Sequence, residues 1–231
     1  MKPFLHTQVK QIVLGSIWCL LLLSSGIRAA EITGTVSFSP RSPQTPVMIS
    51  PYARNRYRPP RTTAPQLAGT SETIIVYLDD HPALEPSPDP TTEPVIDQRE
   101  LTILPHVTPI VSGTTVTFLN SDMVYHNIFS LSKAKQFNLG RYPAGEKHSV
   151  TFDRPGVVEM FCDIHSEMNG VVLVLPNPYF TTVKADGSYR ISNIPPGTYV
   201  VKVWREHSRE TTTKVVTTTT PEEEIILNFQ L

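Results

Sequence analysis

The chain consists of short segments in which apolar and polar residues alternate, or in which apolar residues run together. Alternation with a period of two is typical of a half-buried strand, and it occurs at residues 32–38, 114–119 and 224–231. Continuous apolar runs at residues 73–78 and 171–175 are typical of buried strands. No long segment has the 3.6-residue period of an amphipathic helix. The pattern therefore predicts an all-β protein.

Turn signals place further strands in the second half of the chain. Asp186-Gly187 is typical of a hairpin turn, and Arg154-Pro155-Gly156 and Pro195-Pro196-Gly197 are typical of other tight turns. The strands predicted beside these turns are residues 148–152, 157–161, 189–191, 198–204 and 211–217. Residues 224–231 are predicted to form one continuous strand, with Ile225, Leu227, Phe229 and Leu231 on its buried face.

Proline-rich segments separate the groups of strands. Residues 39–71 are rich in proline and contain five arginines but no acidic residue, which predicts a loop or disordered insertion. Such a basic segment could alternatively bind a membrane or an acidic partner. Residues 81–94 combine proline with Asp and Glu and are predicted to be an acidic linker.

The N-terminus has the pattern of an export signal. Lys2 and Lys10 precede an apolar run at residues 12–23, and small residues up to Ala29 and Ala30 follow it. This pattern predicts a secretory signal peptide at residues 1–30, cleaved after Ala29 or Ala30. The run is short for a membrane span, and the alternative is an uncleaved anchor. We therefore expect a periplasmic or otherwise extracytoplasmic protein that contacts the membrane only through this segment.

Charge and motif content exclude several function classes. Without residues 1–30 the chain loses three of its 20 basic residues and none of its 21 acidic residues, which leaves a net charge of −4. No domain is strongly basic, so nucleic acid is not an expected partner. The sequence contains no Ser/His/Asp arrangement, no HExxH motif and no phosphate-binding glycine loop. We therefore expect a protein that is not an enzyme.

One cysteine remains after removal of the signal peptide. In FCDIHSEMNG, Cys162, His165 and Met168 follow one another at three-residue steps. Cysteines of exported proteins usually pair, and an unpaired one indicates a partner chain, a reactive role or a metal. Thiolate, imidazole and thioether ligands together suit copper, and His126 is the strongest candidate for a fourth ligand. Two His, one Cys and a weak axial Met form a blue-copper electron-transfer site.

Other interpretations of these residues exist. Cys162 could be a small buried hydrophobic residue, Met168 could fill the core, and His126 could be a hydrogen-bonded loop residue. Zinc would also bind Cys and His, although a thioether ligand argues against it. If the copper interpretation holds, the amide of Asn127 is expected to brace the cysteine loop.

The order of these motifs resembles the cupredoxins. Residues 113–118 precede His126-Asn127; Pro143-Ala144-Gly145-Glu146 follows, and then comes Cys-x2-His-x2-Met-x-Gly with an apolar run, as in the amicyanins. The resemblance covers roughly residues 94–176. It implies a Greek-key β-sandwich with one type 1 copper held by His126, Cys162, His165 and Met168. Asp163-Ile164 and Ser166-Glu167 depart from the amicyanin pattern and make the expected partner-docking surface acidic.

Residues 177–231 resemble a carboxypeptidase regulatory-like domain, which is a small transthyretin-like β-sandwich and implies no peptidase activity. The resemblance rests on Ala185-Asp186-Gly187-Ser188-Tyr189 and on residues 193–199. Such domains begin with a Gly-x-Val strand, which here is Gly34-Thr35-Val36, and a second apolar strand. We therefore predict that residues 31–93 and 177–231 form one domain and that the copper domain, residues 94–176, is inserted into it. The alternative is a simple tandem.

Together these observations predict an exported protein that carries single electrons between redox protein partners. His165 is the expected electron exit, and Asp163 beside the sulfur is expected to favour the oxidised state. Two alternatives remain open at this point: a copper carrier or storage protein without a redox role, and a structural or binding module with a vestigial copper site. The sequence does not indicate the oligomeric state.

Overall fold

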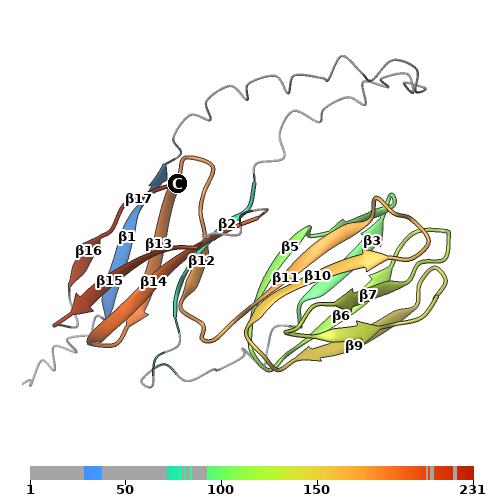
Figure 1. The fold of residues 1–231 in the computed structure, drawn as a ribbon, viewed down its shortest axis with the longest axis horizontal. Helices are drawn as coiled ribbons and strands as arrows, with labels where there is room; N and C mark the ends of the chain where they lie inside the picture. Colours follow the sequence, from blue (N-terminus) through green and yellow to red (C-terminus); the bar gives the residue numbers. More distant parts are fainter. Residues whose placement is uncertain are drawn as a thin grey trace, which may run out of the picture.

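The computed structural model describes residues 29–37, 72–79, 81, 84, 93–206, 208, 211–220 and 223–231. These residues form strands and no helix, which confirms the prediction of an all-β protein (Figure 1). In this part of the chain there is accordingly no helix that could cross a membrane. Most of the predicted signal peptide and the whole segment 39–71 lie outside the described residues.

The middle of the chain forms a two-layer β-sandwich, which we call the metal sandwich. Its strands are β3 (Val95–Arg99), β4 (Thr102–Leu104), β5 (Val107–Val111), β6 (Thr114–Asn120), β7 (Ile128–Leu131), β8 (Gln136–Asn138), β9 (Lys147–Phe152), β10 (Gly156–Cys162) and β11 (Asn169–Leu175). One sheet has the order β5-β11-β10-β7-β8 and the other β4-β3-β6-β9. Alternate residues such as Phe118 of β6 and Met160 of β10 point between the sheets and form a common apolar core.

Strands from both ends of the chain form a second sandwich. These strands are β1 (Ala30–Ser37), β2 (Ile74–Leu78), β12 (Phe180–Thr182), β13 (Ser188–Ile194), β14 (Gly197–Arg205), β15 (Thr212–Thr218), β16 (Glu224–Ile226) and β17 (Phe229–Gln230). One sheet has the order β13-β1-β16, with β17 also on β1, and the other has the order β12-β2-β14-β15. Strands β1 and β2 thus pair with strands that follow the metal sandwich in the chain. The resemblance of this unit to a transthyretin-like domain stays a prediction.

The two sandwiches share a small apolar cluster, which we call the interface cluster: Ile75, Val107, Leu173, Leu175 and Trp204. Along β2, Ile75 points into this cluster, while Ile74, Val76 and Leu78 point into the core of the second sandwich. Strand β11 is buried on both faces in the same way. The two continuous apolar runs of the sequence therefore belong to strands that face a sandwich core on one side and the other sandwich on the opposite side.

The last strand differs from the prediction of one continuous segment. Strands β16 and β17 both pair parallel with β1, but residues 227 and 228 between them are not part of either strand. The side-chain Oδ1 of Asn228 accepts the backbone N–H of Thr35 at 2.9 Å and its hydroxyl at 3.0 Å. The side-chain amide of Asn228 thus replaces a backbone partner of Thr35 and interrupts the hydrogen-bond ladder between β1 and the last two strands. The residue offset of the pairing is the same in β16 and β17.

Strand β1 begins at Ala30, inside the predicted signal peptide. Ala30 is fully buried and pairs with Ile194 of β13. Cleavage after Ala29 would leave this strand intact, whereas cleavage after Ala30 would remove a buried residue from the core. Of the two predicted cleavage positions, only the one after Ala29 would keep Ala30 in this strand.

Candidate metal centre

Three segments of the metal sandwich converge at one end of its sheets. His126 precedes β7 and forms an isolated bridge with Tyr142, through hydrogen bonds of 3.2 and 2.9 Å between their backbones. Cys162 is the last residue of β10 and pairs with Ile128 of β7, so the cysteine lies beside the chain that carries His126. His165 follows on the loop between β10 and β11. The strand register thus brings two distant parts of the sequence together.

The loop that carries His165 is closed by its own backbone. The N–H of Met168 donates to the carbonyl of His165 at 3.0 Å, and the N–H of Cys162 donates to the carbonyl of Met168 at 3.1 Å. These two bonds fix the backbone conformation of the loop that runs from Cys162 through His165 to Met168. The position of His165 is therefore set by the fold.

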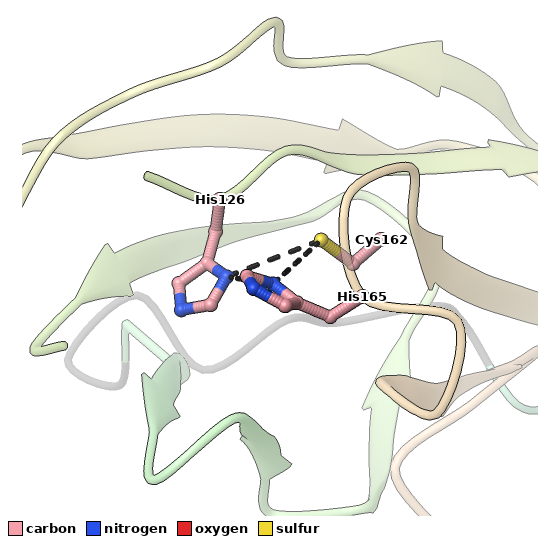
Figure 2. Close-up of side chains that lie close together, drawn as sticks. All are labelled: His126, Cys162 and His165. Carbon is pink, nitrogen blue, oxygen red and sulfur yellow. Dashed lines mark hydrogen bonds between the residues drawn. The ribbon is translucent and has the colours of Figure 1, made fainter. Parts of the chain in front are cut away.

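Three side chains point their donor atoms at a common point (Figure 2). The Nδ1 atoms of His126 and His165 are 3.1 Å apart, and the Sγ of Cys162 is 3.9 Å from each of them. A point in the plane of these atoms, about 2.05 Å from each nitrogen, is about 2.2 Å from the sulfur. Ordinary metal–imidazole and metal–thiolate bonds measure about 2.0–2.1 Å and about 2.3 Å. The three donors therefore fit one metal ion in a trigonal plane.

The fourth predicted ligand, Met168, lies close to this group. Its side chain is buried and belongs to the same apolar cluster as Cys162. Its backbone bonds to Cys162 and His165 place it at the base of the ligand loop. The axial role of its sulfur stays a prediction.

Burial differs sharply among the donors. His126 is fully buried and Cys162 is 5% exposed, whereas His165 is half-buried. Cys162 is a free thiol. His126 and Cys162 therefore form the buried side of the site, and His165 is the donor residue with the greatest contact with solvent.

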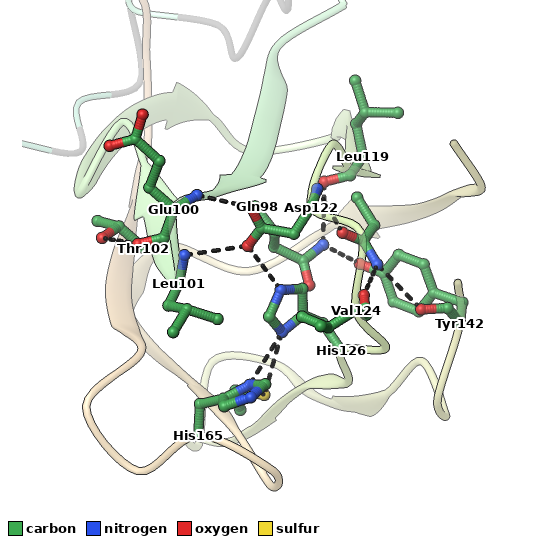
Figure 3. A network of polar contacts seen from close by, with 12 residues as sticks. Gln98, Glu100, Leu101, Thr102, Leu119, Asp122, Val124, His126, Tyr142 and His165 are labelled. Atoms are coloured by element: carbon green, nitrogen blue, oxygen red, sulfur yellow. Dashed lines mark hydrogen bonds and ion pairs between the residues drawn. The ribbon is translucent and has the colours of Figure 1, made fainter. Parts of the chain in front are cut away.

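The second nitrogen of His126 is held by an aspartate that is not among the site residues predicted from the sequence. Nε2 of His126 is 2.8 Å from Oδ2 of Asp122 (Figure 3). Oδ1 of this carboxylate accepts the backbone N–H of Glu100 at 2.6 Å, and Oδ2 also accepts that of Leu101 at 3.0 Å. Asp122 precedes His126 by four residues in a loop. Outside helices and strands such a spacing does not determine which side chains meet, so no signal in the sequence could have indicated the contact.

These contacts also determine the charge of Asp122. Partial burial by itself raises the pKa of the carboxyl group, but the hydrogen bonds from the Leu101 backbone and from His126 outweigh it. The resulting pKa lies below the ordinary value of an aspartic acid, so the group is an anion at neutral pH.

Polar groups next to the loop that carries Asp122 hold it in place. The side chain of Asn120 donates to the carbonyls of Val124 at 2.8 Å and Tyr142 at 3.1 Å, and it accepts the N–H of Asp122 at 3.0 Å. The phenol of Tyr142 is buried against the amide of Gln98, and burial raises its pKa to about 12. The phenol is therefore neutral at physiological pH.

Two further expectations concern Asn127 and Asp163. Asn127 is buried, and its Oδ1 has no hydrogen-bond partner in the part of the chain that the structure describes. Its predicted role as a brace of the cysteine loop stays a prediction. Asp163, beside the cysteine, lies 3.4 Å from the guanidinium of Arg141 on the surface. This ion pair offsets part of the negative charge that the sequence places next to the sulfur.

No protein-family model matches the chain, and no curated protein does. Among solved structures, a purple cupredoxin from Nitrosopumilus maritimus is 29% identical and covers 36% of this chain and 99% of its own, with a TM-score of 0.33. A reduced mutant of amicyanin is 20% identical and covers 43% of this chain and 97% of its own, with a TM-score of 0.34. The copper-containing nitrite reductase of Thermus scotoductus SA-01 is 26% identical, with a TM-score of 0.35. It covers 36% of this chain, and the match spans 22% of the reductase.

Proposed function

We propose that the protein is an exported mononuclear copper protein that carries single electrons between redox partners. One observation carries the proposal: the donors of His126, Cys162 and His165 fit a single ion in a trigonal plane. A His₂Cys trigonal set with a long axial Met is the arrangement of blue-copper electron-transfer sites. Bound copper would supply a one-electron couple between its two oxidation states.

The residues of this chain would contribute a rigid frame to that couple. Strand β10 fixes Cys162, the bridge to Tyr142 fixes His126, and the closed loop fixes His165. Because all three are held by backbone hydrogen bonds, the donor positions change little when the charge at their centre changes. A small structural change on electron transfer favours fast exchange, so this rigidity supports a redox role over simple storage.

The half-buried imidazole of His165 is the proposed route for electrons. Ile164 beside it is 39% exposed, and the loop before His126 presents Met123 and Tyr125, which are 92% and 58% exposed. Exposed apolar residues on the loops that carry both histidines would lower the cost of removing water from the surface when a partner binds. Asp163 and Glu167 add acidic groups to the same ligand loop.

The test is to load the purified protein with Cu(II) and record its visible spectrum. The wild type is expected to be intensely coloured through charge transfer from the Cys162 thiolate, with one copper per chain and reversible reduction. Cys162→Ser should remove the colour, and His126→Ala should change it severely. His81→Ala, which alters a histidine of the second sandwich next to Tyr199, is the matched control and should leave the spectrum unchanged.

Several results would contradict the proposal. A Cys162→Ser protein with the wild-type spectrum would exclude the thiolate as a ligand. Binding of zinc with no coloured copper form would indicate a structural metal site instead. A blue protein that cannot be reduced and reoxidised would indicate a copper carrier or storage protein.

A further inference from the structure

We infer that Asp122 is a positioning residue that commits His126 to bind the metal through Nδ1 and favours the oxidised ion by its negative charge. This inference rests on the proposed copper function and concerns how this chain tunes that site. Its evidence is the contact between Asp122 and Nε2 of His126 and the way the fold holds the carboxylate.

The contact determines which nitrogen of His126 can bind a metal. A neutral imidazole carries its proton on one nitrogen and offers a lone pair on the other. Oδ2 of Asp122 can only accept a hydrogen bond, and it lies 2.8 Å from Nε2, so the proton belongs on Nε2. The lone pair then lies on Nδ1, which is the atom that faces Cys162 and His165 (Figure 2). A carboxylate in this position also makes the imidazole a stronger donor.

The fold holds the carboxylate in place with a specialised turn. Glu100 and Leu101 connect β3 to β4, and both have positive φ angles of 53° and 57°. Two such residues define the type I′ hairpin turn, in which Asn-Gly or Gly-Gly is strongly preferred. Their consecutive N–H groups both point at Asp122. A turn made from unfavourable residues and directed at one side chain indicates that the carboxylate position is important to the site.

No Lys or Arg among the described residues pairs with the carboxylate of Asp122. Within the described ranges, the only ionisable side chain in ion-pair distance of Asp122 is His126 itself. Asp163, which is closer in sequence to Cys162, differs because it pairs with Arg141. The side chain of Asp122 is only 14% exposed, so water screens it weakly. An unpaired anion one imidazole away from the metal stabilises Cu(II) more than Cu(I) and so lowers the midpoint potential.

The decisive experiment compares the wild type with Asp122→Asn, which keeps the size of the side chain and removes its charge. Removal of such an outer partner typically weakens metal binding about 10–100-fold. We expect the loss to be larger for Cu(II) than for Cu(I), measured by competition with chelators specific for each state. The midpoint potential should rise by about 59 mV for every tenfold difference between the two losses.

The matched control is Asp163→Asn. It removes the same charge from the residue next to Cys162, but it touches no ligand nitrogen and its charge is already paired. We expect a clearly smaller change in midpoint potential and Cu(II) affinity than for Asp122→Asn. Equal shifts of the midpoint potential in the two variants would show that Asp122 acts only as one more negative charge near the site, and would overturn the inference.

A second measurement needs no variant and remains decisive if Asp122→Asn does not fold. In the metal-free protein, where no metal dictates the tautomer, nitrogen NMR identifies which ring nitrogen of His126 carries the proton. The inference requires a proton on Nε2, and a proton on Nδ1 would overturn it.

The outcomes separate this inference from the proposed function. A wild type that forms no blue copper site overturns both. A blue wild type whose midpoint potential is unchanged in Asp122→Asn overturns the role of Asp122 alone and leaves the proposed function intact.

Discussion

Replacement of Leu173 by alanine is expected to weaken the packing between the two sandwiches without altering the metal centre. Leu173 is 3% exposed and belongs to the interface cluster, whereas its neighbours Val172 and Val174 point into the core of the metal sandwich. A buried Leu→Ala substitution costs about 2–5 kcal/mol of unfolding free energy, depending on how far the surroundings close the cavity. Because two separate units can shift toward each other, we expect the lower part of this range, about 2–3 kcal/mol.

Trp204 provides the assay. It belongs to the interface cluster, and the only other tryptophan, Trp18, lies in the predicted signal peptide. Urea unfolding of the metal-free protein, without residues 1–29, should therefore be followed by Trp204 fluorescence and by circular dichroism. The two transitions should coincide in the wild type. With a urea dependence of about 2–3 kcal/mol per molar, the fluorescence midpoint of Leu173→Ala should fall by about 1 M.

A double-mutant cycle tests the reasoning directly. Leu173 and Ile75 come from different sandwiches but belong to the same cluster, so their alanine substitutions should be coupled by about 0.5–3 kcal/mol. Ile75→Ala combined with Val172→Ala is the matched control, because Val172 faces the other side of β11, and these effects should add within about 0.5 kcal/mol. Additive effects of Leu173→Ala and Ile75→Ala would refute the packing of the two sandwiches through this cluster.

Three further predictions concern the axial ligand, the chain termini and export. Met168→Gln should keep copper but lower the midpoint potential, since a harder oxygen donor favours Cu(II); loss of copper or an unchanged potential would contradict an axial role. Gly34→Ala should lower the unfolding free energy by about 1–3 kcal/mol, because the added Cβ would lie 2.0 Å from the backbone oxygen of Leu227. The visible spectrum of the copper form should stay unchanged in that variant, and an unaffected stability would argue against the contact. Mass spectrometry of the exported protein should find Ala30 as the first residue; a chain that begins at Glu31 would show that burial of Ala30 does not select the cleavage position.

Much of the fold could be predicted from the sequence because a strand with one buried face has a local pattern of alternating apolar and polar residues. The alternation at residues 114–119 reflects a strand with one buried face, and the structure has β6 there with Val116 and Phe118 in the core. The three-residue steps between Cys162, His165 and Met168 likewise describe one short loop after a strand. In such cases the neighbours in space are neighbours in sequence, so spacing alone is informative.

The tertiary structure decided which distant residues meet. The continuous apolar runs predicted buried strands, but only the packing shows that Ile75 and Leu173 face each other's sandwich. The contact of Asp122 with His126, and the N–H groups of Glu100 and Leu101 that hold it, depend on the path of two loops and on the parallel register of β3 with β6. The interruption at Asn228 depends on the pairing of β1 with strands nearly two hundred residues away. Loop paths and strand registers are set by the packing of the whole sandwich, so no local pattern of residues could specify them.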